Sequence, residues 1–209
     1  METALDVAAE VRAWSDELVR DLSASSLAAR TGGSAGEGIR DGIALGRRRA
    51  RLLDGLCARL FDEALKKTGV EEPIALAAVG SFGRGAVALR SDVDVRLVVG
   101  SGQRAHDAAA KVADALLYPL WDAGLSVGHQ VTSASEALEL AQTDLATATS
   151  LLDLRLIAGD AALVRELVDR AWLGLFSEGQ LGRFVERLEE EVAQRHARFG
   201  ESVYLLEPE

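Results

Sequence analysis

Residues 77–100 read AAVGSFGRGAVALRSDVDVRLVVG, and this stretch decides the fold. An apolar run ends in a glycine-rich turn, and the valine-rich run that follows carries Asp92 and Asp94. Side chains alternate between the two faces of a strand, so both carboxylates share one face and Val93 and Val95 share the other. Two neighbouring carboxylates repel each other and are costly to bury unpaired. The pattern therefore predicts a bound cation, and oxygen-only ligands favour Mg²⁺.

The glycine-rich turn predicts a phosphate-binding site beside these carboxylates. Gly80 and Ser81 follow the first apolar run, where glycine lets the backbone approach a ligand and helix N-terminal amides attract phosphate. Arg84 lies between two glycines and offers a positive charge. Each motif is common by itself. Ten residues separate Ser81 from Asp92, which allows a short helix and a return on a neighbouring strand, so that turn and carboxylates meet.

Composition limits the class of protein. The chain has 209 residues, and its 23 basic and 33 acidic residues give a net charge of -10, which disfavours non-specific binding to nucleic acid. The single cysteine, Cys57, excludes a disulfide framework or a cysteine-based zinc site within one chain. The N-terminal segment is acidic and amphipathic rather than signal-like, and no apolar run of about 18 residues predicts a membrane span. We therefore expect a cytoplasmic protein.

The order of elements predicts an α+β fold with three parts. Residues 1–36 should form an N-terminal helix and a flexible linker, residues 37–134 an α/β core with its preceding helix, and residues 135–209 a C-terminal helical subdomain. The expected strands are a short one within 70–80, after a turn and Pro73, and those at 91–100 and 125–133. The expected helices are 4–22, 39–68, a short one within 81–89, 103–123, 135–142, 144–157, 161–174 and 178–199.

Two further features have a structural and a functional interpretation. The basic run RRRAR at 47–51 lies inside a predicted helix and reads first as a solvated face, with nucleotide or partner contact as the alternative. His129 shares a strand face with Val127 and Val131, which is typical of a partly buried histidine. A role near a nucleotide is the alternative for this side chain.

The motifs resemble those of a known family. Gly80-Ser81 followed by Asp92-Val93-Asp94 is similar to the signature of the DNA polymerase β-type nucleotidyltransferase superfamily. The string VGSFGRGAVALRSDVDVRLVV resembles the N-terminal nucleotidyltransferase domain of the bacterial PII uridylyltransferase/uridylyl-removing enzyme family. Similar segments follow, so that the resemblance covers roughly residues 40–208. They are LLYPLWDAGLSVGHQV at 116–131, DLATATSLLDLRLIAGD at 144–160 and QRHARFGESVYLLEP at 194–208.

The resemblance implies a small mixed β-sheet of the polymerase β type, flanked by helices, and a nucleotidyl transfer reaction. Gly80 and Ser81 would hold the triphosphate, with Arg84 and Ser91 as secondary phosphate contacts. Asp92 and Asp94 would be the catalytic carboxylates and would bind two Mg²⁺ ions. The family transfers UMP from UTP to a tyrosine of the PII signal protein, in nitrogen regulation, and releases pyrophosphate.

One departure keeps alternatives open. The superfamily usually takes a third carboxylate from an adjacent strand, yet the candidate strand LSVGHQVTS has none, and Asp122 and Glu136 lie outside it. A catalytically impaired domain that binds nucleotide or docks a partner is the main alternative to a uridylyltransferase-like enzyme. Transfer to a small molecule is a third. The hydrolase and ligand-sensing domains of the longer family members are not found in these 209 residues.

Overall fold

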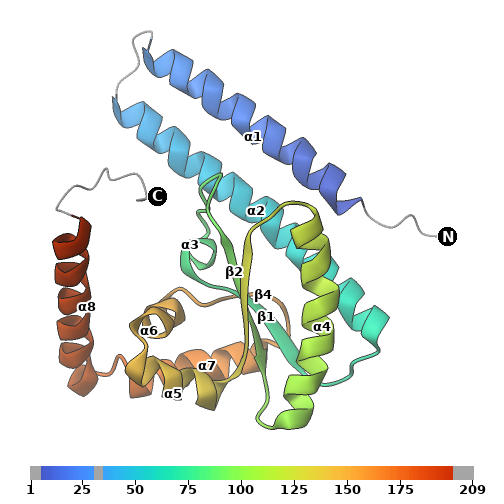
Figure 1. Ribbon diagram of the computed structural model, residues 1–209, viewed down its shortest axis with the longest axis vertical. Coiled ribbons are helices and arrows are strands. Elements are labelled where there is room, and N and C mark those ends of the chain that lie inside the picture. The colour runs from blue at the N-terminus through green and yellow to red at the C-terminus, as the bar shows by residue number, and fades with distance from the viewer. Residues whose placement is uncertain (1–5, 31–34, 200–209) are drawn as a thin grey trace.

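The computed structural model describes residues 6–30 and 35–199 and confirms the α+β class. Helices and strands are interspersed along the chain, and the strands form one small mixed sheet (Figure 1). The helices are α1 Val7–Arg30, α2 Ala35–Thr68, α3 Gly80–Gly83, α4 Gln103–Asp122, α5 Ala134–Thr143, α6 Leu145–Leu152, α7 Ala161–Gly174 and α8 Glu178–Phe199. The strands are β1 Ile74–Ala78, β2 Val93–Val99, β3 Val127–Ser133 and β4 Arg155–Gly159.

The sheet has the strand order β3-β2-β1-β4. The central strand β1 runs antiparallel to both β2 and β4, whereas β2 and β3 are parallel. The parallel pair needs a crossover, and α4 supplies it on one side of the sheet (Figure 1). Because β1 and β2 are antiparallel, the turn after β1 and the start of β2 lie at the same end of these strands.

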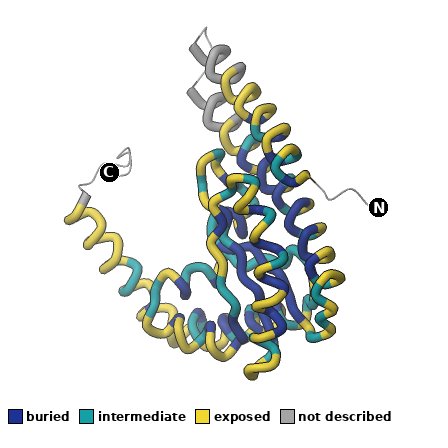
Figure 2. The backbone as a smooth tube through the Cα atoms, turned by 45° about the vertical axis from the view of Figure 1, so that its right-hand side comes forward, coloured by how far each residue is buried: buried dark blue, intermediate teal, exposed yellow. Residues whose placement is uncertain are grey.

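The two faces of the sheet pack against different helices. On β2, Val93, Val95, Leu97 and Val99 face a core built with α1, α2 and α4. The opposite face contributes Val98 to a second core, which contains residues of α5, α6 and α7. Burial is concentrated in β1 and β2 and in the helix surfaces that face the sheet (Figure 2). Asp94 and Arg96 share the second face of β2 with Val98, but neither belongs to its apolar core.

The strand β4 was not expected from the sequence. Residues 144–157 were predicted to be one helix, but α6 ends at Leu152 and Arg155–Gly159 pairs with β1. Leucine, alanine and arginine are good helix formers, so local propensity favours a helix here, and pairing with the exposed edge of β1 overrides it. The sheet consequently gains a fourth strand, which fixes the end of α6 near the turn that follows β1.

Other boundaries differ as well, and the first helix ends at Arg30 rather than at residue 22. The second helix begins at Ala35 rather than at residue 39, and the helix predicted within 81–89 is limited to Gly80–Gly83. The strand β2 begins at Val93, so Asp92 precedes it. Residues 31–34 of the predicted linker and residues 200–208 of the last family-like segment lie outside the described residues.

A glycine at the end of β4 provides a test of this sheet. Gly159 has φ of 86°, and a Cβ there would lie 2.2 Å from the carbonyl oxygen of Ile74 on β1. Gly159→Ala should therefore lower the free energy of unfolding by about 2–5 kcal/mol, measured by urea denaturation. The control is Gly182→Ala in α8, where no atom lies within 4 Å of the added Cβ. It should be neutral or stabilising, by up to about 1 kcal/mol. Equal stability of Gly159→Ala and the wild type would contradict the β1–β4 pairing.

Candidate active site

Asp94 lies between two glycines near the start of β2. It pairs in register with Gly128 of β3, and a Cβ on Gly128 would lie 2.5 Å from Asp94 Oδ1. On the other side, a Cβ on Gly80 would lie 3.6 Å from Asp94 Oδ2. The missing side chain of Gly128 thus leaves the space that this carboxylate occupies, and any larger residue there would displace it.

The charge of Asp94 has no compensation from the protein. The side chain is half-buried, and neither its carboxylate nor that of Asp92 accepts a hydrogen bond or an ion pair from another described residue. Burial raises the pKa of Asp94 above its ordinary value, and the negative charge of Asp92 raises it further. Asp92 itself is exposed. Such a pair of carboxylates is suited to a cation that binds from solvent.

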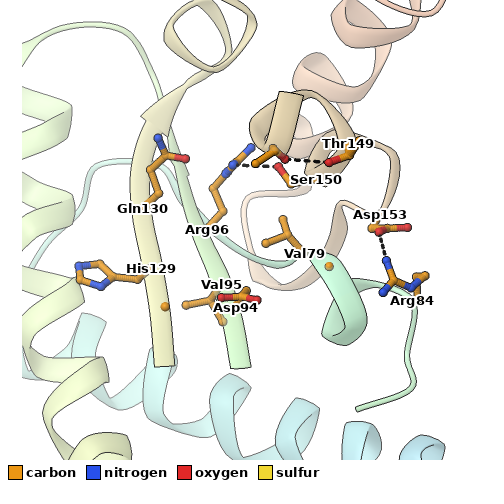
Figure 3. Close-up of a pocket in the computed structure, with 13 residues that line it drawn as sticks. Val79, Arg84, Asp94, Val95, Arg96, His129, Gln130, Thr149, Ser150 and Asp153 are labelled. Atoms are coloured by element: carbon orange, nitrogen blue, oxygen red, sulfur yellow. Dashed lines mark hydrogen bonds and ion pairs between the residues drawn. The ribbon is translucent and has the colours of Figure 1, made fainter. Parts of the chain in front are cut away.

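A cavity of about 500 Å³ opens beside Asp94. It lies between the sheet and α6 (Figure 3). Its wall combines acidic, basic and neutral polar side chains with backbone of the turn and of β3. The lining residues include Gly80, Arg84, Asp94, Arg96, Gly128, Gln130, Ser150 and Asp153. The turn after β1 and one predicted carboxylate therefore meet at one cavity, whereas Asp92 is solvent-exposed just before β2 and does not line it.

The turn after β1 presents backbone N–H groups without a side-chain cap. Gly80 opens α3 with φ of 58°, a conformation that favours glycine. The residue before it, Val79, forms no capping hydrogen bond with its side chain, and the first N–H groups of a helix have no intrahelical acceptor. The hydroxyl oxygens of Ser81 and Ser91 lie 3.4 Å apart. These two residues, both predicted to bind phosphate, therefore place their hydroxyl groups side by side at the turn.

Arg84 lines the cavity but is already paired. Its guanidinium forms an ion pair with Asp153, the residue that follows α6. Gly83 lies against the same residue, because a Cβ on Gly83 would be 2.0 Å from the Asp153 carbonyl oxygen. The turn is thus held against the end of α6. A phosphate that contacts Arg84 must share it with Asp153.

Arg155 holds the turn after β1 in place, a role that the sequence did not reveal. Arg155 donates to the carbonyl oxygens of Gly83 and Phe82 at 3.1 and 3.0 Å and forms an ion pair with Asp54 of α2 at 2.9 Å. Its guanidinium also lies 5.5 Å from the centre of the Phe82 ring. The strand β4 therefore connects α3 to α2.

Arg49 supports the loop that leads into Asp92. It was expected on a solvated face within the basic run 47–51, but it is 5% exposed. Its guanidinium donates to the carbonyl oxygens of Ala88 and Ser91. Arg48 of the same run pairs with Glu17 and Asp21 of α1. Arg49 is thus a positioning residue, and a run of like charges gives no sequence signal for which of its members is buried.

The side chain of His129 points away from the other predicted site residues (Figure 3). It neighbours Gly128 on β3, so its side chain takes the opposite face from Asp94. Its ring packs edge-on against Trp121 of α4, with ring centres 5.9 Å apart, and points away from the cavity (Figure 3). His129 is part of the cavity wall, but its ring lies on the face of β3 that packs against Trp121.

No third carboxylate joins the pair within residues 6–30 and 35–199. No group of three or more His, Cys, Asp or Glu side chains there is arranged to hold a metal ion. The residues of β3 that face the Asp94 side are Gly128, Gln130 and Thr132. The departure noted in the sequence is therefore present in the structure, with a glycine at the position that opposes Asp94.

Comparison with known proteins identifies the family. Residues 34–142, about half of the chain, match the family model described as "Putative nucleotidyltransferase DUF294". The chain belongs to this nucleotidyltransferase family. The match contains the turn after β1, Asp92, Asp94 and Gly128. The α+β fold with a small mixed sheet agrees with a nucleotidyltransferase core.

Bifunctional uridylyltransferase/uridylyl-removing enzymes of bacteria are similar to this chain. That of Nitrobacter hamburgensis is 40% identical over 137 residues, which are 66% of this chain and 14% of the relative. That of Phenylobacterium zucineum is 37% identical over 169 residues, which are 76% of this chain and 18% of the relative. The chain thus spans less than a fifth of the length of these relatives. It is a nucleotidyltransferase domain related to uridylyltransferase enzymes.

The helices that the structure describes lie between residues 6 and 30 and between residues 35 and 199. None of them combines the length with the apolar character that a membrane crossing requires.

The raised pKa of Asp94 predicts a pH-dependent gain from Asp94→Asn. A carboxyl whose pKa is higher in the folded than in the unfolded chain reduces stability as pH rises through the interval between these values. The uncharged asparagine removes this loss. The free energy of unfolding of Asp94→Asn, relative to wild type, should therefore be larger at pH 7 than below about pH 4, as measured by urea denaturation. The control Asp169→Asn, on the exposed face of α7, should stay within about 0.5 kcal/mol at both pH values. A gain that is independent of pH would contradict the electrostatic origin.

Proposed function

We propose that this domain is an Mg²⁺-dependent nucleotidyltransferase that transfers UMP from UTP to a tyrosine of a PII-type signal protein. The observation that carries the proposal is the half-buried, unpaired carboxylate of Asp94 beside the uncapped turn at Gly80. Membership of the family supports the reaction class. The relatives are named uridylyltransferases, which supports UMP as the transferred group. The tyrosine acceptor rests on the resemblance to the PII-modifying family.

The residues present fit a magnesium site. Asp92 and Asp94 offer only oxygen ligands, and Mg²⁺ is bound in proteins by one or two carboxylates together with substrate phosphates and water. The unfavourable charge of Asp94 would be neutralised by the ion. When bound, two Mg²⁺ ions would supply Lewis-acid stabilisation of charge on the transferred phosphoryl group and the leaving pyrophosphate. Asp92 and Asp94 are the residues that we propose to hold them.

The chain's own groups orient the reacting nucleotide. The N–H groups of Gly80 and Ser81, with the hydroxyls of Ser81 and Ser91, would bind the triphosphate at the edge of the sheet. The oxygen of the acceptor hydroxyl forms a bond to the α-phosphorus. The bond between this phosphorus and the oxygen that bridges the α- and β-phosphates breaks. Pyrophosphate leaves, and the proton of the acceptor hydroxyl is released. The backbone geometry of the turn would contribute to catalysis, because the hydrogen-bond donors are in position before the nucleotide binds.

A second function has one observation in its favour. Gly128 opposes Asp94 on β3, and the described residues supply no third carboxylate. A domain that binds nucleotide without transferring it, and that regulates or docks a partner, would need no complete catalytic set. We keep this as the alternative, and transfer to a small-molecule hydroxyl as a variation of the first function.

A transfer assay tests the proposal. The protein is incubated with UTP labelled at the α-phosphate, Mg²⁺ and a PII-type protein, and label in the acceptor is measured. Asp92→Asn and Asp94→Asn should each reduce transfer by about 100-fold or more, the scale of losing an electrostatic group at a reacting phosphate. Chelation of Mg²⁺ should abolish it. Asp169→Asn, remote from the cavity, should retain wild-type transfer.

The alternatives give different outcomes in the same experiment. Mg²⁺-dependent UTP binding without any transfer would favour the non-catalytic module. Transfer that survives the double variant of Asp92 and Asp94 would show that the site is elsewhere. Absence of both transfer and metal-dependent nucleotide binding would overturn the proposal.

A further inference from the structure

Arg96 is a buried cation in the wall of the candidate active site. It follows Asp94 by two positions on β2 and therefore shares its face. The side chain is 4% exposed. It lines the same cavity as Asp94, Gln130 and Ser150 (Figure 3). The sequence motif Asp-Val-Asp-Val-Arg already contains this signal, because its three charged residues alternate with valine.

The guanidinium group has few partners in the protein. Its Nη2 donates to Ser150 Oγ at 3.1 Å. Its Nε and Nη1 are buried and have no hydrogen-bond partner among the described residues. No carboxylate of residues 6–30 and 35–199 forms an ion pair with it. Burial lowers the pKa of Arg96, but arginine remains charged in proteins. The cavity wall therefore contains an uncompensated positive charge.

The fold does not require this charge. A buried ion without a partner destabilises a protein, and apolar side chains of similar volume often replace buried ions without loss of stability. Two positions further along the same face, Val98 packs in the apolar core under α5 to α7. An aliphatic residue at position 96 would continue that pattern. The structure thus gives a reason for a ligand, rather than for packing, at this position.

The surroundings of Arg96 suit an anion. Gln130 pairs in register with Arg96 on β3, so both side chains lie on the cavity side, and Gln130 adds an amide donor. The rise of about 3.3 Å per residue places Arg96 roughly 6–7 Å along β2 from Asp94. An anion bound at Arg96 would therefore lie next to the proposed reaction centre without displacing it.

We propose that Arg96, assisted by Gln130 and Ser150, forms an oxyanion subsite that binds a phosphate or carboxylate group of one of the two substrates. Anion binding at this subsite requires the shielded Nε and Nη1 donors to turn toward the cavity. The identity of the substrates rests on the proposed function, but anion binding by Arg96 does not. Ser91 precedes β2, whereas Arg96 follows Asp94 on this strand, so the two residues lie on opposite sides of Asp94 along the chain. If the triphosphate occupies the turn, the subsite faces the acceptor.

The experiment compares Arg96→Met, Arg96→Lys and wild type in the full chain. The control is Arg165→Met, which removes one exposed positive charge from α7. Inorganic phosphate is titrated without Mg²⁺, Mg²⁺–UTP is titrated separately, and the KM for a PII-type acceptor is measured. Thermal unfolding reports whether each variant folds. Arg96→Met should fold with an unchanged or higher Tm and weaken at least one of these interactions about tenfold or more. Arg96→Lys should retain part of it, and Arg165→Met should match the wild type.

The pattern identifies the source of the anion. Weaker binding of Mg²⁺–UTP by Arg96→Met assigns the subsite to the nucleotide, whereas an unchanged UTP affinity with a raised acceptor KM assigns it to the acceptor. If transfer is absent in the wild type, the proposed function fails and the two titrations still decide the subsite. Should Arg96→Met fail to fold, the same measurements on Arg96→Lys decide the question. Unchanged phosphate binding, UTP binding and acceptor KM in the folded variants would overturn the subsite.

Discussion

The close approach of Asp94 to Gly128 is the constraint on which the site depends. Two parallel strands are held in one register, and the glycine on β3 leaves space for a carboxylate that has no protein partner. The same carboxylate adjoins Gly80, the first residue of the turn after β1. A half-buried negative charge between two glycines is unfavourable for folding. It is retained in a chain whose family transfers nucleotides, a reaction that brings cations and phosphates together.

The remainder of the structure keeps this arrangement rigid. Arg155 of β4 binds the carbonyl oxygens of α3, and Arg49 of α2 binds those of the loop before Asp92. Both arginines have carbonyl or carboxylate partners that offset their charge, in contrast to Arg96 in the cavity wall. The arginines around the site thus have two physical roles. Arg49 and Arg155, which donate to carbonyl or carboxylate oxygens, position the backbone. Arg96, whose one acceptor among the described residues is the Ser150 hydroxyl, is the arginine that we propose binds a ligand.

The sequence was sufficient for the turn, for Asp94 and for the fold class, because these depend on local patterns. Alternation placed Asp94 opposite Val93 and Val95, and the spacing from Ser81 brought the turn beside it. The strand β4 could not be predicted in the same way, since Arg155, Leu156 and Ala158 are good helix formers and the pairing edge of β1 is distant in the sequence. The roles of Arg49 and Gly128 depend on contacts between distant segments. Arg96 is different, because its alternation with Asp92 and Asp94 was visible and only its burial was not.

The most direct test of the account is to locate a bound metal ion. Mn²⁺ replaces Mg²⁺ in the presence of UTP, and paramagnetic broadening of backbone amide signals is followed by NMR. The signals of Gly80, Ser81, Asp94 and Gly128 should broaden first, and Asp94→Asn should remove the effect. Broadening centred on another part of the chain, or equal broadening in Asp94→Asn, would contradict the claim that this carboxylate and the adjoining turn form the nucleotide site.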